Sequence, residues 1–101
     1  MSSRFQRLYV AGRARRRADP KGSKTARLFA AGRDRLAKKL GEEAVEVIIE
    51  AVKGDRDAVV TESADLIYHL VMIWADLGIS PKEIWQEMDR REEARGIAEK
   101  L

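Results

Sequence analysis

Two long apolar stretches joined by a very short polar connection constrain the fold of this chain more than any other feature. Residues 34–53 and 55–77 both place apolar side chains at helical spacing, and Lys53-Gly54-Asp55 leaves room for only a tight turn between them. Two long helices joined in this way run antiparallel. The sequence therefore predicts a helical hairpin.

Capping residues define the expected ends of these two helices. Asp34 is the expected N-cap of the first helix and Gly54 its stop, while Asp55 or Asp57 opens the second helix, which ends at Gly78. Apolar residues cover most of the circumference of both helices. We therefore expect both to be largely buried.

A basic, less regular segment precedes the hairpin. Residues 4–18 can form a helix, and Asp19-Pro20 then interrupts it because proline restricts the residue before it. Ser23 or Thr25 is expected to cap a short second helix that ends near Gly32. The first helix has only a weak apolar face, made of Phe5, Leu8, Tyr9 and Ala11.

One more helix is expected after the hairpin. Ser80-Pro81 is a typical helix start, and Ile84, Trp85 and Met88 show helical spacing before the helix ends near Ala94. No strand pattern is present. The expected fold is all-α: an antiparallel hairpin extended to a four-helix-bundle-like layout, in a single domain of residues 1–101.

Length and composition restrict the class of protein. A chain of 101 residues has a small core and would gain much by pairing with a copy of itself. No apolar run approaches the roughly 20 residues that span a bilayer, and the start lacks a signal-peptide stretch, so we expect a cytoplasmic protein without a membrane partner. Cysteine is absent and His69 is the single histidine, which excludes thiolate sites and a multi-histidine metal site within one chain.

Charge is unevenly distributed along the chain. Residues 1–39 contain 13 lysines and arginines against Asp19 and Asp34, a net charge of +11, which leaves −8 on the remainder. A basic segment of this kind can contact nucleic acid or an anionic substrate, or can be a solvated helix face. Because no zinc-finger, homeodomain or RNA-recognition signature accompanies it, we expect no nucleic-acid partner.

Four carboxylates are expected to converge between the two hairpin helices. Counting from the turn puts Glu46 level with Glu62, and Glu43 level with Asp65, on narrow polar strips of otherwise apolar helices. Acidic pairs at this spacing are commonly solvated surface groups, but two pairs at matching heights repel one another unless a cation or a proton offsets their charge. Oxygen ligands alone favour Mg²⁺, with Mn²⁺ a possible substitute. A di-iron site is disfavoured because neither Glu46 nor Glu62 is followed by histidine three residues later.

Other residues near this cluster have two interpretations each. His69 lies one turn beyond Asp65 and either contacts the site or is a satisfied neighbouring side chain. Lys38 and Lys39 either neutralise phosphates or form a charged helix flank. Trp74 and Trp85 are more consistent with packing than with base stacking.

At these residues the chain resembles the phosphoribosyl-ATP pyrophosphohydrolase family. The paired acidic motifs Glu43-x-x-Glu46 and Glu62-x-x-Asp65 are the signature of the wider MazG-like, all-α pyrophosphohydrolase superfamily, and the residues around them narrow the match. The resemblance extends from about residue 18 to Gly96-Ile97-Ala98-Glu99-Lys100, whereas the first 17 residues match poorly.

The resemblance implies a reaction and a set of site residues. It implies hydrolysis of phosphoribosyl-ATP to phosphoribosyl-AMP and pyrophosphate in histidine biosynthesis, and a homodimer or dimer of dimers. In that reaction the expected Mg²⁺ ligands are Glu43, Glu46, Glu62 and Asp65. Glu42 or Glu46 is the expected proton acceptor. The cations expected to bind the substrate are Lys38, Lys39, Arg27 and Arg33.

Three alternatives stay open at this point. The chain departs from the family pattern at Ser23-Lys24-Thr25 and Gly32-Arg33-Asp34, near the basic segment. A housekeeping MazG-like enzyme acting on another nucleoside triphosphate is the alternative within enzymes. The two alternatives without enzymatic activity are a basic helical nucleic-acid-binding module and an inactive regulatory paralogue.

Overall fold

The computed structural model describes residues 2–95 and confirms the all-α prediction. Within this range the chain forms five α-helices and one short 3₁₀ helix, with no strand. In chain order they are α1 (Ser2–Arg15), η1 (Pro20–Gly22), α2 (Lys24–Ala30), α3 (Arg33–Lys53), α4 (Arg56–Leu77) and α5 (Pro81–Arg95).

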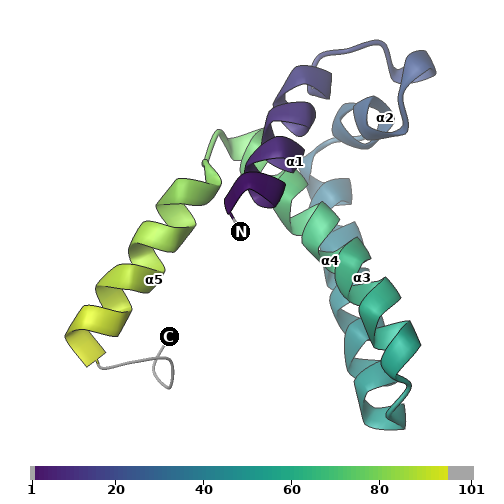
Figure 1. Cartoon of the computed structure of the whole chain (residues 1–101). Coiled ribbons are helices and arrows are strands. Elements are labelled where there is room, and N and C mark those ends of the chain that lie inside the picture. Colours follow the sequence, from purple (N-terminus) through teal and green to yellow (C-terminus); the bar gives the residue numbers. More distant parts are fainter. Residues whose placement is uncertain (1, 96–101) are drawn as a thin grey trace.

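The predicted hairpin is formed by α3 and α4, which lie side by side over most of their length (Figure 1). Gly54 ends α3 at φ 74°, a left-handed conformation that favours glycine. Asp55 then caps α4, because its side chain accepts a hydrogen bond of 3.1 Å from the Ala58 amide. Two residues thus reverse the chain and start the next helix.

Two helix boundaries differ from the sequence prediction. α1 ends at Arg15 rather than near residue 18. α3 begins at Arg33, with Gly32 at φ 98° in the N-cap position, so the prediction that Asp34 is the N-cap is wrong. Asp34 instead lies in the first turn, where a negative charge interacts favourably with the helix dipole.

The core lies where α1 crosses the C-terminal half of α4. Gly12 of α1 is buried against α4: a Cβ atom built there would lie 2.8 Å from Met72 Cε and 3.2 Å from Ala75 Cβ. A side chain at this position would force Met72 to shift, so glycine permits the close approach of α1 to α4. Phe5 packs beside Trp74 and against the edge of Trp85, which confirms a packing role for both tryptophans. The fully or nearly fully buried apolar residues are Ala26, Leu36, Val71, Met72, Trp74 and Ala75.

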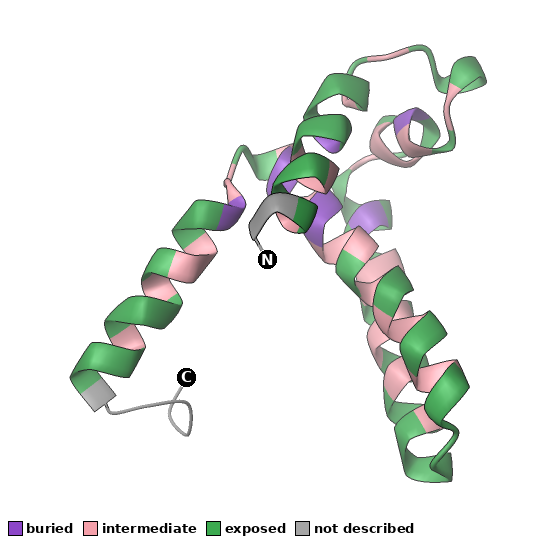
Figure 2. Ribbon diagram, in the orientation of Figure 1, coloured by how far each residue is buried: buried purple, intermediate pink, exposed green. Residues whose placement is uncertain are grey.

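Beyond this core the chain is open. In Figure 1, α5 leaves the end of α4 and extends away from the hairpin, so the two form the arms of an inverted V. The radius of gyration is 15.2 Å, whereas a compact chain of this length has about 13 Å. The buried residues gather near the apex in Figure 2, and a helical bundle is incomplete within one chain.

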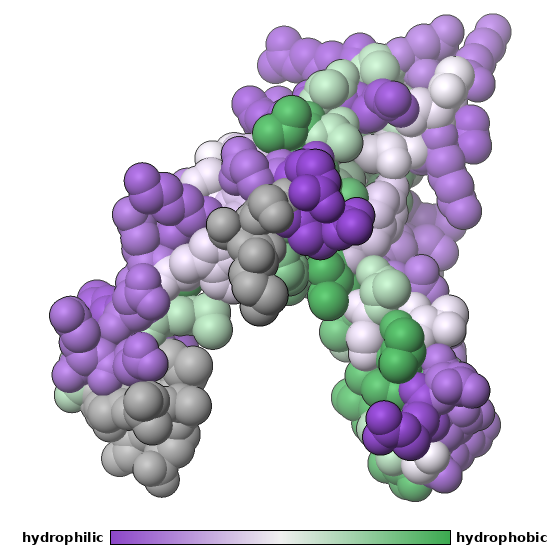
Figure 3. Space-filling view, in the orientation of Figure 1, coloured by the Kyte–Doolittle hydropathy of each residue, from purple (hydrophilic) through white to green (hydrophobic). Residues whose placement is uncertain are grey.

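The hairpin is much less buried than its sequence suggests. Val52 is 85% exposed and Val60 is 70% exposed, on the part of the hairpin nearest the turn. Figure 3 shows apolar residues gathered along this arm. The prediction that both long helices are buried around most of their circumference is wrong for the single chain, because periodicity identifies apolar faces but not what covers them.

Helix α4 is also long and apolar enough to cross a membrane, judged by length and composition alone. The sequence prediction had found no apolar run of this length. The same properties occur in the core helices of soluble proteins. Carboxylates near the middle of α4, at Glu62 and Asp65, would be costly in hydrocarbon, so we do not interpret α4 as a membrane span.

Candidate functional site

Three carboxylates from both hairpin helices lie close together near its middle. Oxygen atoms of Glu43, Glu62 and Asp65 all lie within 4.8 Å of one another. Glu43 and Glu62 are half-buried and Asp65 is exposed. The antiparallel register brings α3 and α4 together at this height, as the count from the turn predicted for Glu43 and Asp65.

This cluster carries negative charge that the described part of the chain does not neutralise. No ion pair reaches any of the three carboxylates among residues 2–95. Desolvation, the negative charges of Glu43, Asp65 and Glu46, and a hydrogen bond with Glu43 raise the pKa of Glu62 above its ordinary value. The donor set, all carboxylate oxygens, therefore suits a hard divalent cation that would offset this repulsion.

The other two predicted acidic residues lie beside the cluster rather than in it. Glu46 is exposed and is not part of the three-carboxylate group, although its charge contributes to the raised pKa of Glu62. Glu42 is exposed, and one of its carboxylate oxygens lies 4.0 Å from Lys39 Nζ.

An open cleft of about 640 Å³ adjoins the cluster, between α2 and the hairpin. Glu43 and Asp65 line one part of it. Four cationic residues also line it, from α2 and from the first turns of α3: Lys24, Arg27, Arg35 and Lys39. The cleft thus lies between a carboxylate cluster and a set of positive charges, a combination that suits a metal-bound polyphosphate.

The structure separates the four cations predicted to bind substrate. Lys39 and Arg27 line the cleft, and Arg27 also donates a hydrogen bond to the Pro20 carbonyl oxygen at 3.1 Å. Lys38 is exposed and is not among the cleft-lining residues.

Arg33 is engaged elsewhere. Its Nε donates a hydrogen bond to Asp76 at 2.7 Å, and Arg16 contacts the other oxygen of the same carboxylate at 3.3 Å. Partial burial acts to raise the pKa of Asp76, but the hydrogen bonds from Arg33 and Arg16 outweigh it and lower the pKa. Arg33 therefore ties α3 to α4 and is not a cleft residue.

Sequence reasoning missed several residues that shape the cleft. Thr25 and Tyr68 join α2 to α4 through a hydrogen bond of 2.5 Å between their hydroxyl oxygens. His69, for which the sequence left a site contact and a neighbouring role both open, was not missed: it lines the cleft, and its Nδ1 lies 2.8 Å from the Asp65 carbonyl oxygen. Lys24 and Arg35 were not singled out, because in the sequence they resemble the other basic residues of this segment. The sequence offers one signal for each of them. Lys24 is four residues before Leu28 and Arg35 is eight residues before Glu43, so each lies on the same helix face as a residue that lines the cleft.

Comparison with known proteins gives a consistent set of matches. The family model described as phosphoribosyl-ATP pyrophosphohydrolase matches residues 5–92. A protein of Bradyrhizobium diazoefficiens named phosphoribosyl-ATP pyrophosphatase 2 is 57% identical over all 101 residues, which cover 75% of that protein. A protein of the same name from Rhodopseudomonas palustris is 54% identical over the whole chain and 77% of its own length.

A third relative, named phosphoribosyl-ATP pyrophosphatase, comes from Gluconobacter oxydans. It is 54% identical over 96 residues, or 95% of this chain and 72% of that protein. The matches include most of the N-terminal segment that sequence reasoning had set apart. The ending at Gly96-Ile97-Ala98-Glu99-Lys100 lies outside the residues that the structure describes.

Proposed function

The chain belongs to the phosphoribosyl-ATP pyrophosphohydrolase family, and we propose that it hydrolyses phosphoribosyl-ATP to phosphoribosyl-AMP and pyrophosphate with Mg²⁺ held by Glu43, Glu62 and Asp65. The observation that carries the metal site is the meeting of these three carboxylates without a neutralising partner among the described residues. The reaction is a step of histidine biosynthesis, and we expect it to take place in the cytoplasm.

Mg²⁺ at this site would place positive charge beside the phosphorus under attack and lower the pKa of a nearby water. Mn²⁺ offers the same oxygen preference and is the expected substitute. Both roles need a polyphosphate beside the carboxylates, and the adjoining cleft provides space for one.

The protein's own groups would complete the reaction. Glu46 lies one turn from Glu43 and is exposed, so it is the better placed of the two predicted bases to accept a proton from the attacking water. Glu42 instead neutralises part of the charge of Lys39. Lys39, which lines the cleft one turn before Glu43, would stabilise the negative charge that develops on the leaving pyrophosphate.

A second copy of this chain is the proposed cover for the exposed hairpin face. Val45 is 52% exposed and Ile48 is 60% exposed, on the arm where Val52 and Val60 are also exposed. Apolar patches of this kind on soluble proteins commonly mark protein interfaces.

Sedimentation tests this proposal, and we expect the wild-type protein to be a dimer. Ile48→Asp should give a monomer. Val10→Asp, which changes an exposed valine of α1, is the control and should leave the dimer unchanged. A monomeric wild-type protein would contradict the proposal.

Pyrophosphate release from a substrate panel tests the proposed function. Phosphoribosyl-ATP with Mg²⁺ is compared with dUTP, dCTP, ATP and oxidised nucleotides at equal concentrations. We expect phosphoribosyl-ATP to give the highest kcat/KM, and EDTA to stop the reaction. A higher kcat/KM for another triphosphate would favour a housekeeping role. No release from any member of the panel would favour an inactive paralogue.

A further inference from the structure

Two groups of basic residues in the N-terminal half differ in their partners. Arg16 and Arg33 both contact the Asp76 carboxylate, and Arg13 donates a hydrogen bond to the Ala75 carbonyl oxygen at 2.8 Å. These arginines attach α1 and α3 to α4. Lys24 and Arg35, by contrast, line the cleft and take part in no ion pair within residues 2–95.

One of the two unpaired cations, Arg35, lies well along α3 from the carboxylates. Arg35, Lys39 and Glu43 follow one another at four-residue intervals along α3, and all three line the cleft. At about 1.5 Å of rise per residue, Arg35 lies about 12 Å along the helix from Glu43, and Lys39 lies halfway between them. Lys39 can therefore serve the same polyphosphate as the metal site, whereas Arg35 lies a further turn away.

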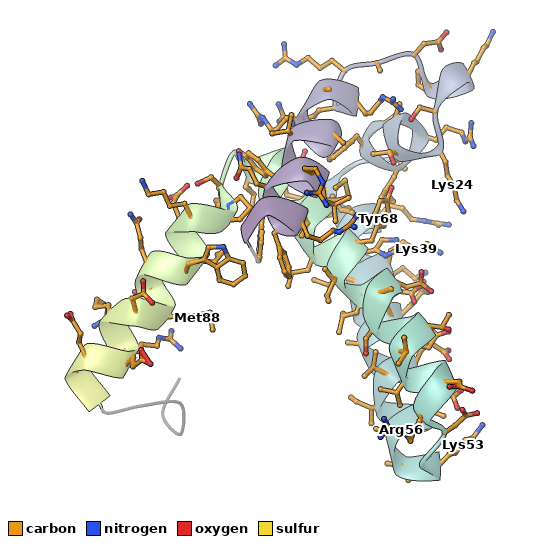
Figure 4. The ribbon with its side chains drawn as sticks, viewed as in Figure 1. Lys24, Lys39, Lys53, Arg56, Tyr68 and Met88 are labelled. Carbon is orange, nitrogen blue, oxygen red and sulfur yellow. The ribbon has the colours of Figure 1, made fainter. Side chains whose placement is uncertain are left out.

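The backbone that presents Lys24 is held on both sides. Ser23 caps α2 by accepting a hydrogen bond from the Ala26 amide at 3.1 Å, and the Thr25 hydroxyl bonds to Tyr68 of α4. Lys24 lies between these two attachments. Figure 4 shows Lys24 and Lys39 on the same side of the molecule, where α2 approaches the hairpin. These contacts fix the position from which the Lys24 side chain extends.

We propose that Lys24 and Arg35 bind the phosphate of the phosphoribosyl group, remote from the anhydride that is cleaved. This inference rests on the proposed function. Phosphoribosyl-ATP has anionic groups at two separate places, the triphosphate and the monophosphate of the second ribose. With the triphosphate at the carboxylates and Lys39, the remaining phosphate needs cations farther along the cleft. Ordinary nucleoside triphosphates lack this phosphate, so Lys24 and Arg35 become specificity-determining residues.

Binding of two nucleotides that lack the pyrophosphate, measured without divalent metal, tests this role directly. Phosphoribosyl-AMP has the remote phosphate, whereas AMP does not, and neither contains the pyrophosphate. We expect the wild-type protein in EDTA to bind phosphoribosyl-AMP at least about tenfold more tightly than AMP in calorimetry. Lys24→Ala and Arg35→Ala should each weaken phosphoribosyl-AMP binding by about tenfold and change AMP binding by less than about twofold. Circular dichroism checks that each variant is folded.

Lys21→Ala is the matched control, because Lys21 is an exposed lysine of η1 that does not line the cleft. It should keep the wild-type preference. Equal weakening of both ligands, or a full preference in the Lys24→Ala/Arg35→Ala double variant, would overturn the inference. If AMP binds too weakly to measure, loss of phosphoribosyl-AMP affinity in both variants but not in Lys21→Ala is the required result.

Pyrophosphate release by the wild-type protein distinguishes failure of the proposed function from failure of the role proposed for Lys24 and Arg35. If the wild-type protein releases pyrophosphate from phosphoribosyl-ATP and the double variant keeps the preference for phosphoribosyl-AMP, only the role of Lys24 and Arg35 fails. If the wild-type protein releases none, the proposed function fails as well. A supporting result is a larger fall in kcat/KM for phosphoribosyl-ATP than for ATP in Arg35→Ala.

Discussion

The two halves of α4 belong to one helix but have different surroundings. The C-terminal half is covered by α1, and Val71, Met72 and Ala75 there have no exposed surface. The half nearer the turn contains Glu62 and Asp65, whose charge has no partner among the described residues. Figure 2 shows this change from buried to exposed along the hairpin. One half therefore stabilises the chain, while the other contains the proposed metal site and the exposed apolar face.

Replacing a core methionine is the strongest test of this division. Met72→Ala removes a fully buried side chain beside Gly12 and should lower the free energy of unfolding by about 2–5 kcal/mol. Met88→Ala makes the same change on α5, where the residue is 38% exposed, and should cost less than about 1 kcal/mol. Urea unfolding measures both. Equal costs would contradict the assignment of the core to the crossing of α1 and α4.

Asp76 marks the C-terminal end of the stable half, and its replacement should have an intermediate effect. Asp76→Asn weakens the contacts with Arg16 and Arg33 and should cost about 1–2 kcal/mol at pH 7. Because Arg33 and Arg16 outweigh the effect of burial and lower the pKa of Asp76 in the folded state, this contribution is complete above the ordinary carboxyl pKa. It is lost as the pH falls through the lower, folded-state pKa.

The difference in unfolding free energy between wild type and Asp76→Asn, measured from pH 7 down to pH 3, checks the pH dependence. It should shrink below about pH 4. Asp89→Asn changes an exposed aspartate of α5 and should show no such trend. A difference that is constant over this range would exclude an ionised Asp76 as its cause.

A substitution in the carboxylate cluster should have the smallest effect on stability, and the opposite sign. Glu43→Gln removes one charge from three that repel one another, so the metal-free protein should melt at a slightly higher temperature. Glu42→Gln, next to it but outside the cluster, should not stabilise the protein. Thermal melts in EDTA compare the two. A lower melting temperature for Glu43→Gln would show that the cluster is not under electrostatic strain without metal.

Local sequence signals predicted the hairpin and the approach of Glu43 to Asp65 in the carboxylate cluster. Gly54, Asp55 and Ser23 end or cap helices through contacts within a few residues, and such contacts can be read from the sequence. Glu43 and Asp65 lie at the same height along the hairpin because the turn is short and the rise per residue is constant. The same count gives the height of Glu46 on the helix but not the direction of its side chain, which is exposed and outside the three-carboxylate group.

Long-range contacts account for what the sequence did not reveal. Arg33 was expected in the substrate site, but it meets Asp76, which is 43 residues away in the chain. Lys24 and Arg35 could not be told from the structural arginines without knowing which cations have partners. The exposed valines of the hairpin show the same limit, because an apolar face in a sequence does not reveal what covers it.

Mg²⁺-dependent pyrophosphate release by Asp65→Asn tests the central claim most directly. Asp57→Asn, an exposed aspartate in the first turn of α4 and outside the cluster, is the matched control. If Glu43, Glu62 and Asp65 hold the metal, Asp65→Asn should reduce kcat/KM for phosphoribosyl-ATP by at least about a hundredfold while Asp57→Asn stays near wild type. Asp65→Asn protein that is folded and still releases pyrophosphate at the wild-type rate with Mg²⁺ would contradict the account.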